Sequence, residues 1–110
     1  MALVADENAT TTHTGTTVVG PVGGTVDVGS NNFVSIESEL VMVDDGTLEV
    51  PSHQYASSPD LFHSHSFVPD AVQQSYFLIE GRPVILKGDS YNADPTEIDS
   101  AGSNTFVTVN

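Results

Sequence analysis

The stretch Gly29-Ser-Asn-Asn-Phe-Val-Ser-Ile36 decides the fold prediction, because a near copy of it starts at Gly102 and runs Gly-Ser-Asn-Thr-Phe-Val-Thr-Val109. Gly, Ser, Asn, Phe and Val are identical in place, and the other positions pair Asn with Thr, Ser with Thr and Ile with Val. A weaker third copy, at 75–86, aligns with 32–43. Each copy places a turn before a short apolar strand, so the sequence predicts three repeats of one β unit.

Three degenerate repeats in one chain can fold with pseudo-threefold symmetry. Such a body is suited to cap a true trimer, because each repeat can meet one subunit through similar contacts. Small repeat units cannot bury their apolar faces alone, so they pack against one another or against a partner. We therefore expect a single domain over residues 1–110, with repeat units near 29–46, 72–89 and 102–110.

The composition also indicates an all-β protein. Val and Thr are β-branched and favour strands, while nine Gly and six Pro supply turns. Alternating residues at 25–28 predict a half-buried strand, and 75–88 predict a hairpin joined through Glu80-Gly-Arg-Pro83. The stretch Asp70–Gln74 is the only place for even a short helix. Three segments are expected to lack strands: a loose arm at 1–17, a long irregular loop at 51–70 and a polar loop at 89–101.

The charge balance excludes several functions. The chain has two Lys plus Arg against fifteen Asp plus Glu, a net charge of −13. It cannot neutralise a run of phosphates, which argues against nucleic-acid binding, and an anionic membrane surface would repel it. The acidity fits either adaptation to a saline environment or a specific partner with a basic surface.

The absence of Cys removes disulfides, Cys-based zinc sites and thiol nucleophiles from consideration. The start of the sequence lacks a basic region followed by a long apolar core, so no secretory signal is expected. No apolar run approaches the roughly 18 residues of a membrane-spanning helix. We expect a protein made in the cytoplasm, monomeric by itself and without stable membrane anchoring.

The repeat stretches resemble the PAAR-repeat family. Units of that family run as Gly-Ser, a short apolar strand, an Asn-Gly-Arg/Lys-Pro turn and a second apolar strand ending in Gly-Asp. Glu80-Gly-Arg-Pro83 and Gly88-Asp89 fit this pattern best, whereas the first unit departs from it with Glu37-Ser-Glu39 at the turn. The third unit stops after its first strand. The segment from Thr12 to Pro21 is similar to the His-containing entry to the family's first repeat.

The resemblance implies a small conical β protein on the tip of a trimeric β-helical spike. Such proteins serve in contractile phage tails, type VI secretion and related injection systems, in the virion tail tip or an extracellular injection particle. It implies a structural role without catalysis, one tip chain per trimer, and a broad base that docks on the blunt spike end. The residues expected to build the core and the docking base are Phe33, Val34, Ile36, Phe77, Ile79, Phe106 and Val107.

The four histidines are the candidate metal ligands. His63 and His65 are two apart, so on a strand they point to the same face and can share a metal. Four imidazoles without Cys suit zinc, or alternatively iron. The family holds one zinc with three His and a Cys, and His13, His53 and His65 match its His positions. The family Cys has no counterpart here, so either His63 or Asp94 substitutes, with His63 favoured because it adjoins His65, or the site is absent.

Two other classes remain as alternatives. The pair His63-x-His65 resembles half of the cupin metal motif, but Pro69-Asp70 stands where the expected Glu would follow. A virion decoration or adhesion module of β-sandwich type would need neither metal nor threefold repetition. The sequence contains no Gly-rich phosphate loop and no Ser nucleophile in an elbow motif, so we expect no enzyme.

Overall fold

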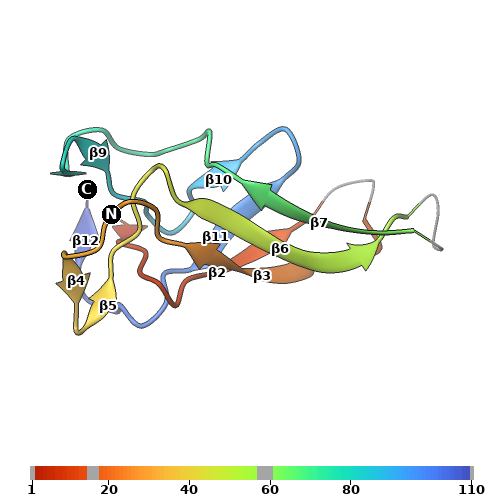
Figure 1. The fold of residues 1–110 in the computed structure, drawn as a ribbon, viewed down its shortest axis with the longest axis horizontal. Helices are drawn as coiled ribbons and strands as arrows, with labels where there is room; N and C mark the ends of the chain where they lie inside the picture. The colour runs from red at the N-terminus through yellow and green to blue at the C-terminus, as the bar shows by residue number, and fades with distance from the viewer. Residues whose placement is uncertain (1, 15–17, 57–60, 110) are drawn as a thin grey trace.

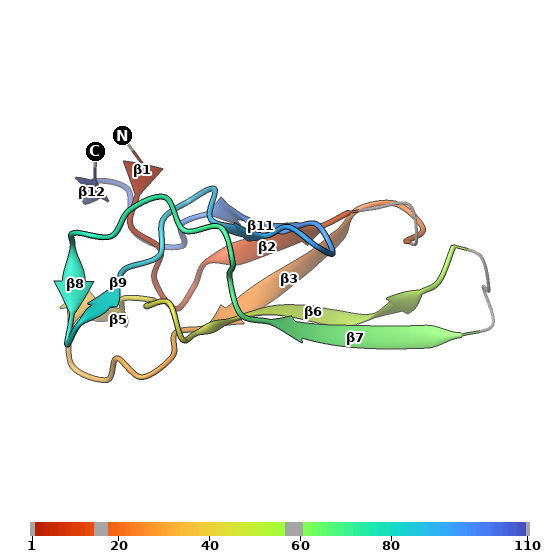
Figure 2. The same ribbon diagram turned by 90° about the horizontal axis from the view of Figure 1, so that it is seen from above.

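The computed structural model describes residues 2–14, 18–56 and 61–109. They form an elongated body with principal extents of 42 × 23 × 22 Å, blunt at one end and tapered at the other (Figures 1 and 2). The all-β prediction is confirmed, and none of these residues lies in a helix, including Asp70–Gln74, the only stretch that left room for a short one. A helix able to cross a membrane is accordingly missing from the described part.

Three short antiparallel strand pairs gather at the blunt end (Figures 1 and 2). The first two pairs are hairpins from the first and second repeats. The third pair joins the two ends of the chain, so the last repeat is completed by the N-terminal segment. The pairs are β4 (Ser35–Ile36) with β5 (Glu39–Leu40), β8 (Leu78–Ile79) with β9 (Arg82–Pro83), and β12 (Thr108–Val109) with β1 (Ala2–Leu3).

The other six strands form one antiparallel sheet that curls into a half-barrel toward the tapered end (Figure 2). Each repeat contributes one hairpin to it, and the hairpins stand side by side in the order β10-β11-β2-β3-β6-β7. The edge strands approach each other through an isolated bridge between Ala71 and Ser90. The strands are β2 (Thr10–His13), β3 (Val22–Asp27), β6 (Thr47–Gln54), β7 (Phe62–Phe67), β10 (Ser90–Tyr91) and β11 (Thr96–Ser100).

Two closed rings of backbone hydrogen bonds tie the three repeats together. In the first ring Ala5 N donates to Ile85 O, Ile85 N to Met42 O and Met42 N to Ala5 O, at 2.9–3.0 Å. All three residues are fully buried. The second ring joins Glu7 N to Leu40 O, Asp44 N to Pro83 O and Lys87 N to Leu3 O, also at 2.9–3.0 Å. Each repeat therefore bonds to both of the others, as a threefold arrangement requires.

One buried amide side chain per repeat holds the chain at the same place in each unit. The Asn31 Nδ2 donates to the Val34 and Val41 carbonyls, and its Oδ1 accepts from two backbone amides just after it. Asn104 repeats the pattern with Val107 and Val4, and Gln74 repeats it with Phe77 and Val84. Because buried backbone groups must be paired, the three amides define equivalent positions.

The apolar core is layered along the long axis. A blunt-end cluster of valines and other aliphatic residues lies inside the three short strand pairs, with Val4, Val41 and Val84 in equivalent places. A second cluster around Met42, Ile85 and Leu48 fills the wider part of the half-barrel. Toward the tapered end the buried side chains become polar, and His13 and His53 replace aliphatic residues.

Three loop predictions are wrong. The segment 1–17 contains β1 and β2 and supplies Val4 and Ala5 to the core, so it is no loose arm; residues 15–17 lie outside the described part. The segment 51–70 contains most of a hairpin, and 89–101 contains β10 and β11; residues 57–60 are not described. These strands were missed because their inward-facing positions carry mostly Thr and His instead of a clear apolar alternation.

Candidate metal centre

Three strands bring the four histidines to the inside of the half-barrel. His63 and His65 alternate with exposed residues on β7, as their spacing predicts. His53 pairs with His63 across β6 and β7, after an irregularity in register between Val50 and His53. Val50 and His53 are both buried although three positions separate them, so this shift carries the histidine to the inner face. His13 ends β2 and is fully buried.

The four imidazoles form one compact cluster. One ring nitrogen from each of His13, His53, His63 and His65 lies within 4.8 Å of the others. The His13 ring centroid is 5.1 Å from that of His53 and 5.0 Å from that of His65. Tyr55 packs edge-on against His63 at 3.6 Å between centroids, and Phe67 stacks on His65 at 4.8 Å. Aromatic rings therefore close the cluster on two sides.

Hydrogen bonds fix the orientation of two of these rings. The Thr96 hydroxyl donates to the Asp94 carbonyl, so its contact with His13 at 2.8 Å requires His13 Nδ1 to be the donor. The His53 Nδ1 donates to the Pro51 carbonyl at 2.8 Å. In the neutral rings the Nε2 atoms then carry free lone pairs, which is how protein surroundings commonly orient metal-binding histidines.

The polar atoms inside the cluster lack partners that protein groups would normally supply. His13 Nε2 and His65 Nε2 are buried without a hydrogen bond, and His63 Nδ1 is too. His53 Nε2 and His63 Nε2 lie 2.5 Å apart. Buried polar atoms are rarely left unpaired, and a cation shared by the four nitrogens would satisfy the inward-facing ones. The residues therefore fit a metal ion that four imidazoles could hold together.

Asp94 lies at the side of this cluster. Its carboxylate oxygens are 3.8 Å from His13 Nε2 and 3.7 Å from His65 Nε2. Both residues named as replacements for the missing Cys are thus close to His13 and His65. His63 belongs to the four-nitrogen group, whereas Asp94 adds a negative charge beside it. That charge would favour a bound cation.

The surroundings of three of the histidines favour the neutral, metal-binding form. Burial lowers the pKa of His13 and of His65 below the ordinary value of 6.5, although the Asp94 carboxylate opposes this for both. Burial also lowers the pKa of His63, and the neighbouring His53 and His65 add to the effect. A metal needs the free lone pair of a neutral imidazole, so these shifts reduce the competition from protons.

The residues predicted for the core and docking base separate into two groups. Ile79 is buried, and Val34, Ile36 and Val107 pack against the blunt-end core. Three aromatic members are exposed instead: Phe33 by 57%, Phe77 by 41% and Phe106 by 58%. Their assignment to the core is wrong, because the buried amide before each one turns the chain so that the aromatic side chain faces solvent. They remain available for docking.

Tyr76 is a member of the exposed set that the sequence prediction left out. It stands two residues after Gln74, as Phe33 stands after Asn31 and Phe106 after Asn104, and it is 64% exposed. The alignment of the weaker repeat with 32–43 already placed Tyr76 opposite Phe33. Each repeat therefore presents one exposed aromatic ring at the equivalent position.

Comparison with known proteins yields no match: no family model fits the chain, and neither the curated proteins nor the solved structures contain a similar one.

Proposed function

We propose that this chain is a PAAR-like spike-tip protein that caps a trimeric β-helical spike, one chain per trimer. The observation that carries the proposal is the threefold repetition at the blunt end. Two closed hydrogen-bond rings, three equivalent buried amides and three equivalent exposed aromatics give this end a threefold pattern. A trimer presents the same contact three times, so each repeat would meet one subunit.

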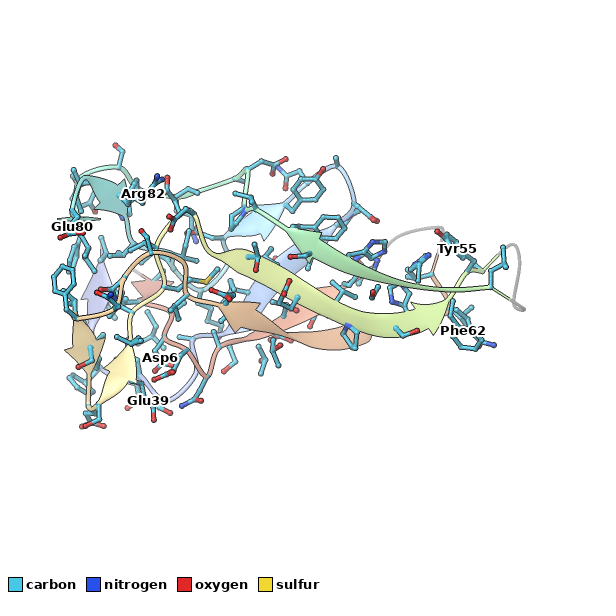
Figure 3. The ribbon with its side chains drawn as sticks, viewed as in Figure 1. Asp6, Glu39, Tyr55, Phe62, Glu80 and Arg82 are labelled. Carbon is cyan, nitrogen blue, oxygen red and sulfur yellow. The ribbon has the colours of Figure 1, made fainter. Side chains whose placement is uncertain are left out.

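The shape of the molecule supports the same role. The body tapers from the blunt end to the hairpin of β6 and β7, where Tyr55 and Phe62 are located (Figure 3). A tip that leads through an envelope needs a narrow end opposite a broad docking face. We infer that the protein works in a contractile phage tail or injection machine, as part of the particle and without catalysis.

The histidine cluster would serve this role as a structural clip. The tapered end has little apolar core. A metal ion held by His13, His53, His63 and His65 would therefore join the β2–β3 hairpin to the β6–β7 hairpin. We propose zinc, since neutral imidazoles and a closed set of four ligands are typical of structural zinc sites. Iron is the alternative. The metal would contribute folding stability, because the unfolded chain has no preformed site.

Mixing the protein with a trimeric spike protein from the same source tests the function. Mass measurement of the complex should give one tip chain per three spike chains, and electron microscopy should place it on the blunt spike end. A stoichiometry of three tip chains per trimer, or no complex, would contradict the proposal. Metal analysis of the purified protein should give about one zinc per chain, and none after careful purification would contradict the clip.

A further inference from the structure

The turns of two blunt-end hairpins each carry a glutamate at a position of positive φ, which favours Asn or Gly. Glu37 and Glu80 occupy the same place in the β4–β5 and β8–β9 turns, with φ of 49° and 50°. The next residues, Ser38 and Gly81, also have positive φ. Two-residue turns of this kind favour Asn followed by Gly, and a long side chain rarely adopts positive φ. A carboxylate at both turns is therefore not explained by the turn itself.

Both glutamates are exposed at the blunt end. Glu80 lies at its edge in Figure 3, and the β4–β5 hairpin that carries Glu37 lies at the same end in Figure 1. Glu80 makes no ion pair with the neighbouring Arg82, whose guanidinium instead bonds Asp44 at 3.2 Å and Asp45 at 3.3 Å. Lys87, the other cation of the chain, lines a groove with Glu97 and Asp99 on the flank.

The exposed aromatics lie on the same end as these carboxylates. Phe33 and Tyr76 precede the two hairpins, and Phe106 precedes the third strand pair. A groove lined by Tyr76, Phe77, Leu78, Thr108 and Val109 runs between the second and third repeats. The blunt end thus combines an exposed apolar surface with a carboxylate at the turn of each of its two hairpins. A second copy of this chain would bring like charges together there, so the surface does not suit self-association.

We propose that the blunt end recognises a protein face of threefold symmetry with an apolar centre and Lys or Arg side chains at its corners, and that Glu37 and Glu80 steer the encounter. This inference rests on the proposed function and specifies the partner's chemistry. Opposite charges at the rim of an interface act mainly on the association rate and its salt dependence. The aromatic rings then supply the buried contact that keeps the complex together.

The test measures the association rate with the spike trimer at low and high salt by surface-immobilised binding. The double variant E37Q/E80Q should associate about tenfold more slowly at low salt, with a shallower salt dependence and little change in dissociation. The double variant E37N/E80N should unfold at higher denaturant, because Asn suits the turn, and still associate slowly. The control E97Q removes an exposed carboxylate from β11 and should leave the rate unchanged.

The possible results separate this inference from the function on which it rests. Association of both double variants at the wild-type rate, with the salt dependence retained, would overturn the charged partner face alone. An equal fall in the association rate of E97Q would also overturn the charged partner face, because the rate would then depend on the total charge of the protein. If the wild type forms no complex with the trimer, the proposed function fails together with this inference. Loss of binding in F33S/Y76S/F106S with normal folding would support the function independently of charge.

Discussion

The two ends of the molecule are stabilised in different ways. At the blunt end, backbone bonds link all three repeats, and the aliphatic core lies directly inside them. At the tapered end the buried residues are histidines and threonines, and some of their polar atoms have no partner within the described chain. The blunt end thus pairs its buried amide side chains with backbone groups of the chain, whereas the tapered end gathers unpaired histidine nitrogens that could bind a cation. The following changes, ordered by expected effect, test this contrast.

Removal of residues 1–5 should abolish folding. Ala5 belongs to the first hydrogen-bond ring, Val4 to the core, and Ala2–Leu3 to the third strand pair. Circular dichroism and amide NMR dispersion should show an unfolded chain. The matched control is a permuted chain that joins the two termini through a short turn and opens between Glu80 and Gly81. It keeps every ring residue and should fold, and failure of the control would contradict the ring interpretation.

Replacement of a buried amide should be the most damaging single change at the blunt end. Asn104→Ala leaves the Val4 and Val107 carbonyls and two backbone amides without their side-chain partner. We expect a loss of about 3 kcal/mol in the free energy of unfolding, measured with urea. Asn31→Ala should lose a similar amount. The exposed Asn8, whose side chain donates to the Ser103 hydroxyl, should tolerate Ala within about 0.5 kcal/mol.

Metal removal should loosen the tapered end selectively. A chelator should lower the free energy of unfolding by about 2.7 kcal/mol relative to a sample holding free metal at a hundred times its Kd. Hydrogen exchange should accelerate at His53 and His65 but not at Ala5, Met42 and Ile85 in the ring. His53→Gln should abolish the response to chelator. A uniform change at both ends would contradict the division between them.

Acidification of the metal-free protein should destabilise it below pH 6.5. The unfolded histidines take up protons near 6.5, whereas the folded pKa values of His13, His63 and His65 are lower. The unfolded state therefore binds more protons in this window, and the free energy of unfolding falls as pH falls. Above 6.5 these groups have no effect. Urea unfolding at pH 7.5, 6.5 and 5.5 measures the trend, and His63→Gln should reduce it.

The smallest effect is expected at Arg82. Its ion pairs with Asp44 and Asp45 are half exposed, so Arg82→Gln should cost no more than about 1 kcal/mol, less in high salt. The pairs join the second repeat to the first at the blunt end. A loss above about 2 kcal/mol in the free energy of unfolding would mean that these exposed ion pairs contribute nearly as much as the buried amides. That result would contradict the contrast between buried and surface interactions.

Much of this arrangement could be predicted from sequence, because repetition and β-branched residues both indicate strands. The position of the third repeat's second half could not. Its core segment is Val4-Ala5-Asp6, which shares only one residue with Val41-Met42-Val43 and lies at the opposite end of the sequence from the first half of that repeat. Buried Asp6 serves there because it accepts hydrogen bonds from the Ser103 and Asn104 amides, a role invisible in an apolar pattern.

The four histidines of the candidate site could be predicted from the sequence, but the residues that orient their rings could not. The spacing of His63 and His65 indicated a shared face, and all four histidines meet. The Thr96 hydroxyl that orients His13 gave no signal, because it lies 83 positions away within a segment predicted to be a loop. The exposure of Phe33 and Phe106 was also hidden, since a turn followed by an aromatic residue is as typical of a core strand as of a surface.

The meeting of the two termini in the third strand pair has a consequence for anything attached to the chain. The first and last strands pair with each other, so both termini lie together at the blunt end (Figure 1). A domain fused to either terminus would begin beside the aromatic rings and compete with a partner for room there. A label that must leave the blunt end free belongs instead near Tyr55 and Phe62, at the far end of the molecule (Figure 3).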